Sequence, residues 1–304
     1  MPMPLQRLKG SIPPLLTPFR NGEVDYDSYG RLIEMQIAEG SHGILVNGTT
    51  SEPASLTIEE RNRLVTYAID KVGGRVPVVA ATGSQSLAET RVLTDHAVAA
   101  GADALLIVTP YYSRPPQRGI IEYYLECTRA HSVPWMIYHI PGRAAVNVTV
   151  DTVKELKDRS PAFVGMKHAS PDLDFVSECF AAVGQDFRIF VGLEDLSFPM
   201  MAVGACGLMN AVGNLRPGVL SEMCEAVWRG DLKRGQELHH RLHELNKAVF
   251  FDTNPIPMKY MARRLGIIPV NEHRLPMAPA TPELEKRLDA VLARAGLLSK
   301  QAAE

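Results

Sequence analysis

The sequence has no apolar run that approaches the roughly 18 residues of a membrane-spanning helix. Its first ten residues, MPMPLQRLKG, lack the apolar core of a signal peptide. Its 32 basic and 34 acidic residues nearly cancel, and no long basic run occurs. A surface that binds nucleic acid or anionic lipid would need such an excess of positive charge. These absences predict a cytoplasmic protein without a membrane or nucleic-acid partner.

Cysteine is scarce, and its spacing excludes further classes of protein. The chain has four cysteines, Cys127, Cys179, Cys206 and Cys224, and no Cys-x-x-Cys pair. A disulfide framework is therefore not expected, and reduced, buried thiols suit a cytoplasmic protein. Linkers rich in glycine and serine are also missing from the 304 residues. A hydrophobic share of 46% with 22% charged residues excludes a disordered chain.

Eight short apolar runs recur along the chain. They are apolar throughout, as parallel strands covered on both faces are. We expect strands at 11–17, 43–47, 76–82, 103–109, 134–139, 162–167, 187–192 and 206–211. The first is the weakest prediction, because Pro13 and Pro14 each lack a backbone N–H donor.

Amphipathic stretches lie between these runs and predict helices. Thr57 with Glu60, and Ser86 with Glu89, have the spacing of a capping box. The expected helices are 25–40, 57–72, 86–100, 117–131, 149–158, 172–183, 195–204 and 217–229.

Eight strands alternating with eight helices favour a TIM (β/α)8 barrel over residues 8–230. An open doubly wound sheet is the alternative, but no G-x-G-x-x-G or Walker loop follows the first strand. Residues 231–304 predict a C-terminal helical region packed on the barrel, with helices near 231–250, 255–265 and 282–296.

Active sites of this fold gather at the carboxyl ends of the strands. Lys167 follows the apolar run 162–166, so burial is expected to lower its pKa and leave an amine that can form a Schiff base. The plainer alternative is a strand-end lysine that reaches solvent. Tyr138 and Thr49 offer hydroxyls for proton transfer. Thr50 with the amides of its turn, and Arg143, could each hold a carboxylate.

Other chemistries have weaker support. His239, His240 and His243 fall on a polar helical stretch without a carboxylate in a known zinc pattern, so we interpret them as a solvated helix face. A glycosidase or a magnesium-dependent enolase would need paired carboxylates at the strand ends, and the sequence lacks such a pair. We expect no metal and no cofactor beyond a covalent imine.

Four motifs follow one another in an order that resembles a known family. They are Gly48-Thr49-Thr50-Ser51-Glu52, Tyr111-Tyr112, Tyr138-x-x-Pro141-x-Arg143 and Gly165-Met166-Lys167. From about residue 8 to 295 the chain resembles the dihydrodipicolinate synthase / N-acetylneuraminate lyase family. The resemblance implies a TIM-barrel class I aldolase with a helical C-terminal region. It also implies a homotetramer built as a dimer of dimers.

The resemblance assigns a role to each motif residue. Lys167 would form the imine with pyruvate or another 2-oxo acid, and Tyr138 would be the general acid and base. Thr49 would connect Tyr138 to Tyr112, which reaches in from the neighbouring subunit in this family. Thr50 would hold the pyruvate carboxylate, with Gly192 and Met209 giving backbone contacts near the imine. Arg143 would hold the carboxylate of an aldehyde substrate.

The favoured reaction is the condensation of pyruvate with L-aspartate 4-semialdehyde in lysine biosynthesis. Four departures from the family pattern, Ser51, His139, Ala144 and His168, leave the second substrate open. The alternative is an aldolase, dehydratase or deaminase acting on a 2-keto-3-deoxy sugar acid or a hydroxyproline catabolite. A non-catalytic homologue that binds 2-oxo acids, and a metal-dependent class II aldolase, are weaker alternatives.

The resemblance also implies a site for feedback by lysine at the tight-dimer interface. Arg61 would place a cation beside a cationic ligand, and Ile58 cannot form a hydrogen bond. We therefore expect lysine to inhibit weakly or not at all. The matching positions are Pro53, Ala54, Ile58, Arg61, Gln85, Glu89 and Tyr111.

Overall fold

Eight short parallel strands form one curled sheet in the computed structural model, which describes residues 4–298. Around the sheet, neighbouring strands follow each other in chain order, with β1 hydrogen-bonded to β10. The strands are β1 (Gly10–Ser11), β4 (Ile44–Val46), β5 (Val78–Ala81), β6 (Ala104–Val108), β7 (Trp135–His139), β8 (Phe163–His168), β9 (Arg188–Val191) and β10 (Gly207–Leu208).

The sheet closes because the segment after β1 pairs with β4. Pro14 and Leu45 form a parallel bridge, and the Leu15 amide donates to the Leu45 carbonyl at 3.0 Å. The predicted TIM barrel is confirmed, and the open-sheet alternative is wrong. The predicted strand 11–17 is correct only at its start, since Pro13 and Pro14 cannot donate and β1 is limited to two residues.

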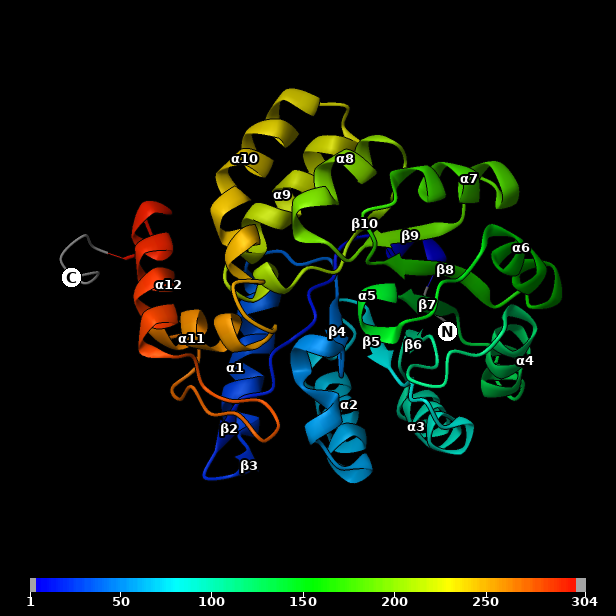
Figure 1. The fold of residues 1–304 in the computed structure, drawn as a ribbon, viewed down its shortest axis with the longest axis horizontal. Coiled ribbons are helices and arrows are strands. Elements are labelled where there is room, and N and C mark those ends of the chain that lie inside the picture. The colour runs from blue at the N-terminus through cyan, green and yellow to red at the C-terminus, as the bar shows by residue number, and fades with distance from the viewer. Residues whose placement is uncertain (1–3, 299–304) are drawn as a thin grey trace.

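Helices cover the outside of the barrel (Figure 1). The predicted starts at Thr57 and Ser86 are N-caps: Thr57 accepts from the Glu60 amide in a complete capping box, and Ser86 accepts from the Glu89 amide. The helices after the strands are α1 (Tyr26–Ala38), α2 (Ile58–Val72), α3 (Leu87–Ala100), α4 (Gln117–Thr128), α6 (Val150–Arg159), α7 (Leu173–Val183), α8 (Ser197–Ala202) and α9 (Pro217–Trp228).

Some short elements were not predicted. A hairpin of β2 (Phe19–Arg20) and β3 (Glu23–Val24) turns through Asn21 and Gly22, both at positive φ. The single-turn helix α5 (Pro141–Ala144) follows β7. The described part of the chain also contains five 3-10 turns: η1 (Leu5–Arg7), η2 (Thr49–Ser51), η3 (Pro53–Ser55), η4 (Glu194–Leu196) and η5 (Ala211–Asn214). These elements are too short for hydrophobic periodicity to reveal.

The buried side chains form two layers. A large outer cluster lies between the strands and the helices. A smaller cluster fills the barrel interior, because successive strand residues point to opposite faces. The inner cluster contains Tyr138 and Met209 together with Leu8, Ile12, Leu45, Val79, Ala81, Ala104, Leu106, Met136, Val164, Ala169 and Phe190.

The C-terminal region is helical, as predicted. It consists of α10 (Leu232–Ala248), α11 (Ile256–Arg264) and α12 (Pro282–Arg294). Figure 1 shows α10 beside α9, and α12 at the edge of the molecule. The last six residues of the predicted region 231–304 lie outside the described residues.

Two further findings concern the described residues. The four cysteines are unpaired, and three of them are buried, whereas Cys206 is half-buried. Within residues 4–298, no helix has the length and apolar character needed to cross a membrane.

Candidate active site

Lys167 and Tyr138 are paired neighbours on β8 and β7, at the carboxyl ends of these strands. Both side chains are buried, and the Lys167 Nζ lies 4.4 Å from the centre of the Tyr138 ring. Gly192 stands beside them: a Cβ at that position would approach the Lys167 Cε to 3.0 Å and the Ala169 Cβ to 2.8 Å. The absence of a side chain at Gly192 therefore leaves room for the lysine.

The hydroxyls of Thr49 and Tyr138 are hydrogen-bonded at 3.1 Å. Thr49 opens the turn η2, which directly follows β4, whereas Tyr138 comes from β7. The closed barrel thus joins two predicted site residues that are 89 positions apart in the sequence.

Thr50 and Arg143 share a partner that the sequence analysis missed. Asn254 Nδ2 donates to Thr50 Oγ1 at 3.0 Å, and the Arg143 guanidinium donates to the Asn254 carbonyl at 3.4 Å. Because Thr50 Oγ1 accepts from Asn254, its own hydroxyl hydrogen is left to donate elsewhere. No local sequence pattern indicates that Asn254 lies at this site.

A pocket of about 560 Å³ lies beside these residues, although neither Lys167 nor Thr50 is among the residues that line it. Thr49, Tyr138, Arg143 and Asn254 line it. Arg143 is exposed on α5, which Figure 1 shows near the centre of the barrel. The volume suits one small organic molecule.

Gly192 lies against the Lys167 side chain, and the backbone amides of Gly192 and Met209 are already engaged. The Gly192 amide donates to the His168 carbonyl at 2.7 Å, and the Met209 amide donates to the Val191 carbonyl at 2.9 Å. Only their carbonyl oxygens could therefore offer the expected backbone contacts.

Tyr112 is not brought to the pocket of its own chain. Its side chain is 88% exposed, and its backbone has a φ of 71°. Within residues 4–298, no hydrogen bond joins it to Thr49. The adjacent Tyr111 does line the pocket.

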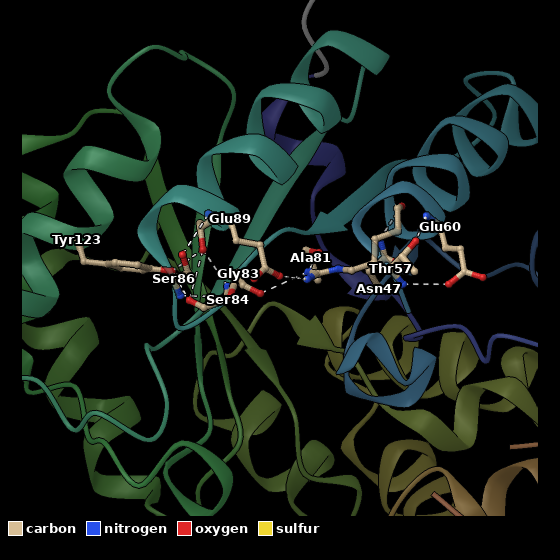
Figure 2. Close-up of polar contacts among 11 residues, drawn as sticks. Asn47, Thr57, Glu60, Ala81, Gly83, Ser84, Ser86, Glu89 and Tyr123 are labelled. Carbon is tan, nitrogen blue, oxygen red and sulfur yellow. Dashed lines mark hydrogen bonds and ion pairs between the residues drawn. The ribbon is translucent and has the colours of Figure 1, made fainter. Parts of the chain in front are cut away.

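Arg61 forms one wall of the same pocket and is buried. Its guanidinium donates to the carbonyls of Ala81 and Gly83 and pairs with the Glu89 carboxylate at 3.3 Å. Figure 2 shows Ala81, Gly83 and Glu89 gathered at this point. Of the positions expected to bind lysine, Pro53, Ala54, Arg61, Glu89 and Tyr111 line the pocket, whereas Ile58 and Gln85 do not.

The sequence of this chain was compared with those of known protein families. A model of the dihydrodipicolinate synthetase family matches residues 7–295. The chain belongs to this family. The prediction made from the four motifs is confirmed.

Individual family members resemble the chain over nearly its full length. A protein of Thermus thermophilus, named 4-hydroxy-tetrahydrodipicolinate synthase, is 45% identical over 96% of this chain and 98% of its own. One of Oleidesulfovibrio alaskensis with the same name is 40% identical over 96% of this chain and 100% of its own. The crystal structure of dihydrodipicolinate synthase from Aquifex aeolicus superposes with a TM-score of 0.93 at 39% identity, covering 95% and 98% of the two chains.

The departure from the dihydrodipicolinate synthase pattern at Ser51 is accommodated without strain. Ser51 ends the 3-10 turn, and its hydroxyl donates to the Leu15 carbonyl at 2.6 Å. The left-handed conformation falls instead on Glu52, with a φ of 56°. Ser51 itself is not among the residues with positive φ.

Glu52 is held in that conformation by a buried cluster behind the turn. Its carboxylate pairs with Lys259 on α11 and lies 3.4 Å from the His273 Nδ1. Lys259 also donates to the Glu272 carbonyl at 2.8 Å. The C-terminal region thus supports the turn that carries Thr49 and Thr50, which no local sequence pattern revealed.

Glu194 is a further buried acid close to the site. Burial raises the pKa of Glu194 to about 7, although the Ala211 amide donates to its Oε1 at 2.7 Å and Lys167 opposes the shift. No local sequence pattern assigns a role to Glu194.

Proposed function

We propose that this chain condenses pyruvate with L-aspartate 4-semialdehyde, the activity of a 4-hydroxy-tetrahydrodipicolinate synthase. The observation that carries the proposal is the buried Lys167 against Tyr138, whose hydroxyl is bonded to Thr49 beside an open pocket. The names of the relatives support the main functional prediction and its enzyme class, a lyase of the aldolase type.

The proposed reaction begins at the Lys167 amine. The amine attacks C2 of pyruvate, and the resulting carbinolamine loses water to give an imine. Loss of a proton from C3 converts the imine to an enamine, whose C3 then bonds to the aldehyde carbon. The aldehyde oxygen takes up a proton to become a hydroxyl. The protonated imine is the electron sink. After the C–C bond has formed, the α-amino group of the second substrate attacks the imine carbon, which closes the ring and releases the Lys167 amine. No metal or cofactor is proposed.

Tyr138 and Thr49 are proposed to move the protons. The phenol is next to the lysine and 3.1 Å from the Thr49 hydroxyl. A proton leaving the carbinolamine or arriving at the aldehyde oxygen can pass along these two hydroxyls. A positioned acid or base typically contributes about 10²–10⁴-fold to rate.

Thr50 and Arg143 are proposed to hold the two carboxylates. The Thr50 hydroxyl hydrogen is free for the pyruvate carboxylate, and the first amides of a helical turn have no partner within the turn. Arg143 lies at the rim of the pocket, where its guanidinium can grip the carboxylate of the incoming aldehyde. Gly192 and Met209 would contact the imine through their backbone carbonyl oxygens.

A homotetramer built from two tight dimers is also proposed, with Tyr112 completing the site of a neighbouring subunit. The exposed aromatic ring of Tyr112 supports this proposal, since aromatic residues are enriched in interface cores. Sedimentation velocity tests it: a fully active monomer would contradict the shared site. The four unpaired cysteines support a reducing, cytoplasmic location.

Trapping with borohydride tests the central step. Pyruvate plus borohydride should add a reduced three-carbon adduct to Lys167, identified by peptide mass spectrometry. A turnover panel of L-aspartate 4-semialdehyde, 2-keto-3-deoxy sugar acids and hydroxyproline catabolites, repeated in chelator, then identifies the substrate. A missing adduct at saturating pyruvate would contradict the mechanism. If the adduct forms but only a sugar acid is turned over, the sugar acid replaces L-aspartate 4-semialdehyde as the proposed substrate.

A further inference from the structure

A pair of buried histidines lies directly behind the two central site residues. His139 follows Tyr138 on β7, and His168 follows Lys167 on β8, so the two histidines are also paired across the strands. Because side chains alternate along a strand, they point out of the barrel while Tyr138 and Lys167 point in. Their Nδ1 atoms are 3.2 Å apart, and both side chains are buried.

The partners of the pair determine where its protons are. The Val148 amide can only donate, and it points at the His139 Nε2 at 3.3 Å, so this nitrogen is an acceptor. Neutral His139 therefore carries its proton on Nδ1 and donates to the His168 Nδ1. His168 in turn carries its proton on Nε2 and donates to the Asp172 carbonyl at 3.0 Å.

This chain of three hydrogen bonds runs in one direction, and His139 has an additional side-chain hydrogen bond with Asn147. It begins at Val148, in the loop after α5, and ends at Asp172, the N-cap of α7. The Phe175 ring stacks on His168 with centres 5.1 Å apart, which fixes the plane of that imidazole. The chain therefore links the loop that follows Arg143 to the strand that carries Lys167.

We propose that His139 and His168 are positioning residues. Through this hydrogen-bond relay they keep Arg143 and Lys167 in fixed positions relative to each other. The proposal rests on the proposed function, in which these two groups hold the aldehyde and form the imine. Neither histidine touches a reacting atom. A misplacement of about 1 Å in such a site can cost about 10²-fold in rate. The relay contributes oriented hydrogen bonds in addition to the space that the two imidazole rings fill.

Breaking the relay at each end should produce different defects. His168→Leu leaves the His139 donor and the Asp172 carbonyl without partners, so we expect imine formation with pyruvate to slow about 10-fold or more. His139→Asn keeps a donor toward His168 but is too short to accept from Val148. We expect it to raise KM for the aldehyde about 10-fold while pyruvate trapping stays within about 2-fold. His168→Gln, which retains an acceptor and a donor, should stay close to wild type.

The experiment measures borohydride trapping rates, kcat and KM for each variant, with thermal unfolding as the check on folding. His243→Gln, at an exposed position on α10, is the matched control. Hydrogen exchange at the Val148 amide gives a readout independent of activity: it should be protected in the wild type and lose protection in His139→Asn.

The two proposals fail in distinguishable ways. If pyruvate and borohydride do not label Lys167 in the wild type, the proposed function is contradicted. Hydrogen exchange at the Val148 amide then still tests the relay, because it does not depend on activity. An active wild type, with His139→Asn showing unchanged aldehyde KM and unchanged Val148 protection, overturns the relay. If His168→Leu does not fold, His168→Gln and His139→Asn decide the question by the same comparisons.

Discussion

The ammonium of Lys259 lies 2.5 Å from a carboxylate oxygen of Glu52, and both side chains are excluded from solvent, at 0% and 1% exposure. Burial lowers the pKa of Lys259, while the Glu52 carboxylate opposes that shift. The pair joins α11 to the residue that ends the Thr49–Ser51 turn. A helix far along the chain therefore contributes to the shape of the active-site turn.

Removing the Lys259 ammonium should destabilise the protein strongly. Lys259→Met leaves the Glu52 carboxylate buried without its main partner, a change that typically costs about 3–5 kcal/mol. Lys247→Met removes an exposed pair with Asp195 and should cost at most about 1 kcal/mol. Denaturant unfolding at equilibrium measures both. Similar small losses for the two variants would show that the buried pair has no such role.

The phenol of Tyr138 should matter for rate rather than for binding. Tyr138→Phe removes the hydroxyl that bonds to Thr49 and keeps the ring beside Lys167. We expect kcat to fall about 10²–10⁴-fold with little change in the affinity for pyruvate. Steady-state kinetics and pyruvate titration separate the two quantities. Equal small changes in both would mean that Tyr138 only packs.

Arg143 should affect the aldehyde and spare pyruvate. Arg143→Met removes a guanidinium at the pocket rim, and a lost hydrogen bond to a charged group costs about 1.5–3 kcal/mol. That loss corresponds to about a 10–150-fold higher KM for L-aspartate 4-semialdehyde. Arg118→Met, exposed on α4, is the control. An unchanged KM for the aldehyde would favour a substrate without this carboxylate.

Lysine should inhibit weakly or not at all. The Glu89 carboxylate, the group that could hold a lysine ammonium, already pairs with Arg61. The buried Arg61 guanidinium adds a cation to the same wall and would repel a cationic ligand. Titration of lysine into the steady-state assay is the measurement. Strong partial inhibition at sub-millimolar lysine would show that Arg61 binds the ligand carboxylate instead.

Acid should weaken the folded state through the histidine pair. Burial first, and then His168, lower the pKa of His139 to about 4, against about 6.5 in an unfolded chain. Between these values the unfolded chain binds more protons, so stability is present above pH 6.5 and is lost as the pH falls toward 4. The loss is at most about 3 kcal/mol at 1.36 kcal/mol per pKa unit.

A double variant isolates this effect. The carboxylates of Asp151, Asp172 and Glu178 line the adjoining pocket and are present in both proteins. The variant His139→Gln/His168→Gln should therefore show a shallower decline of unfolding free energy than the wild type between pH 6.5 and 4. Parallel pH curves would refute the assignment of this slope to the histidines.

The family, the barrel and the strand-end positions of the candidate site residues could be predicted from the sequence because their signals are local. An apolar run ending in Met166-Lys167 places a lysine at a strand end by itself, and Thr57 with Glu60 marks a helix start whatever surrounds it. Motif order along the chain then indicated the family without any knowledge of contacts.

Only the tertiary structure decided which of these groups meet. Thr49 reaches Tyr138 because strands β4 and β7 lie in one closed barrel, and Asn254 reaches Thr50 across 204 positions. Lys259 and Glu52, like His139 and His168, are single residues whose types fit many environments. Their partners depend on barrel closure, register and the docking of the C-terminal helices, which are long-range properties that no short stretch of sequence specifies.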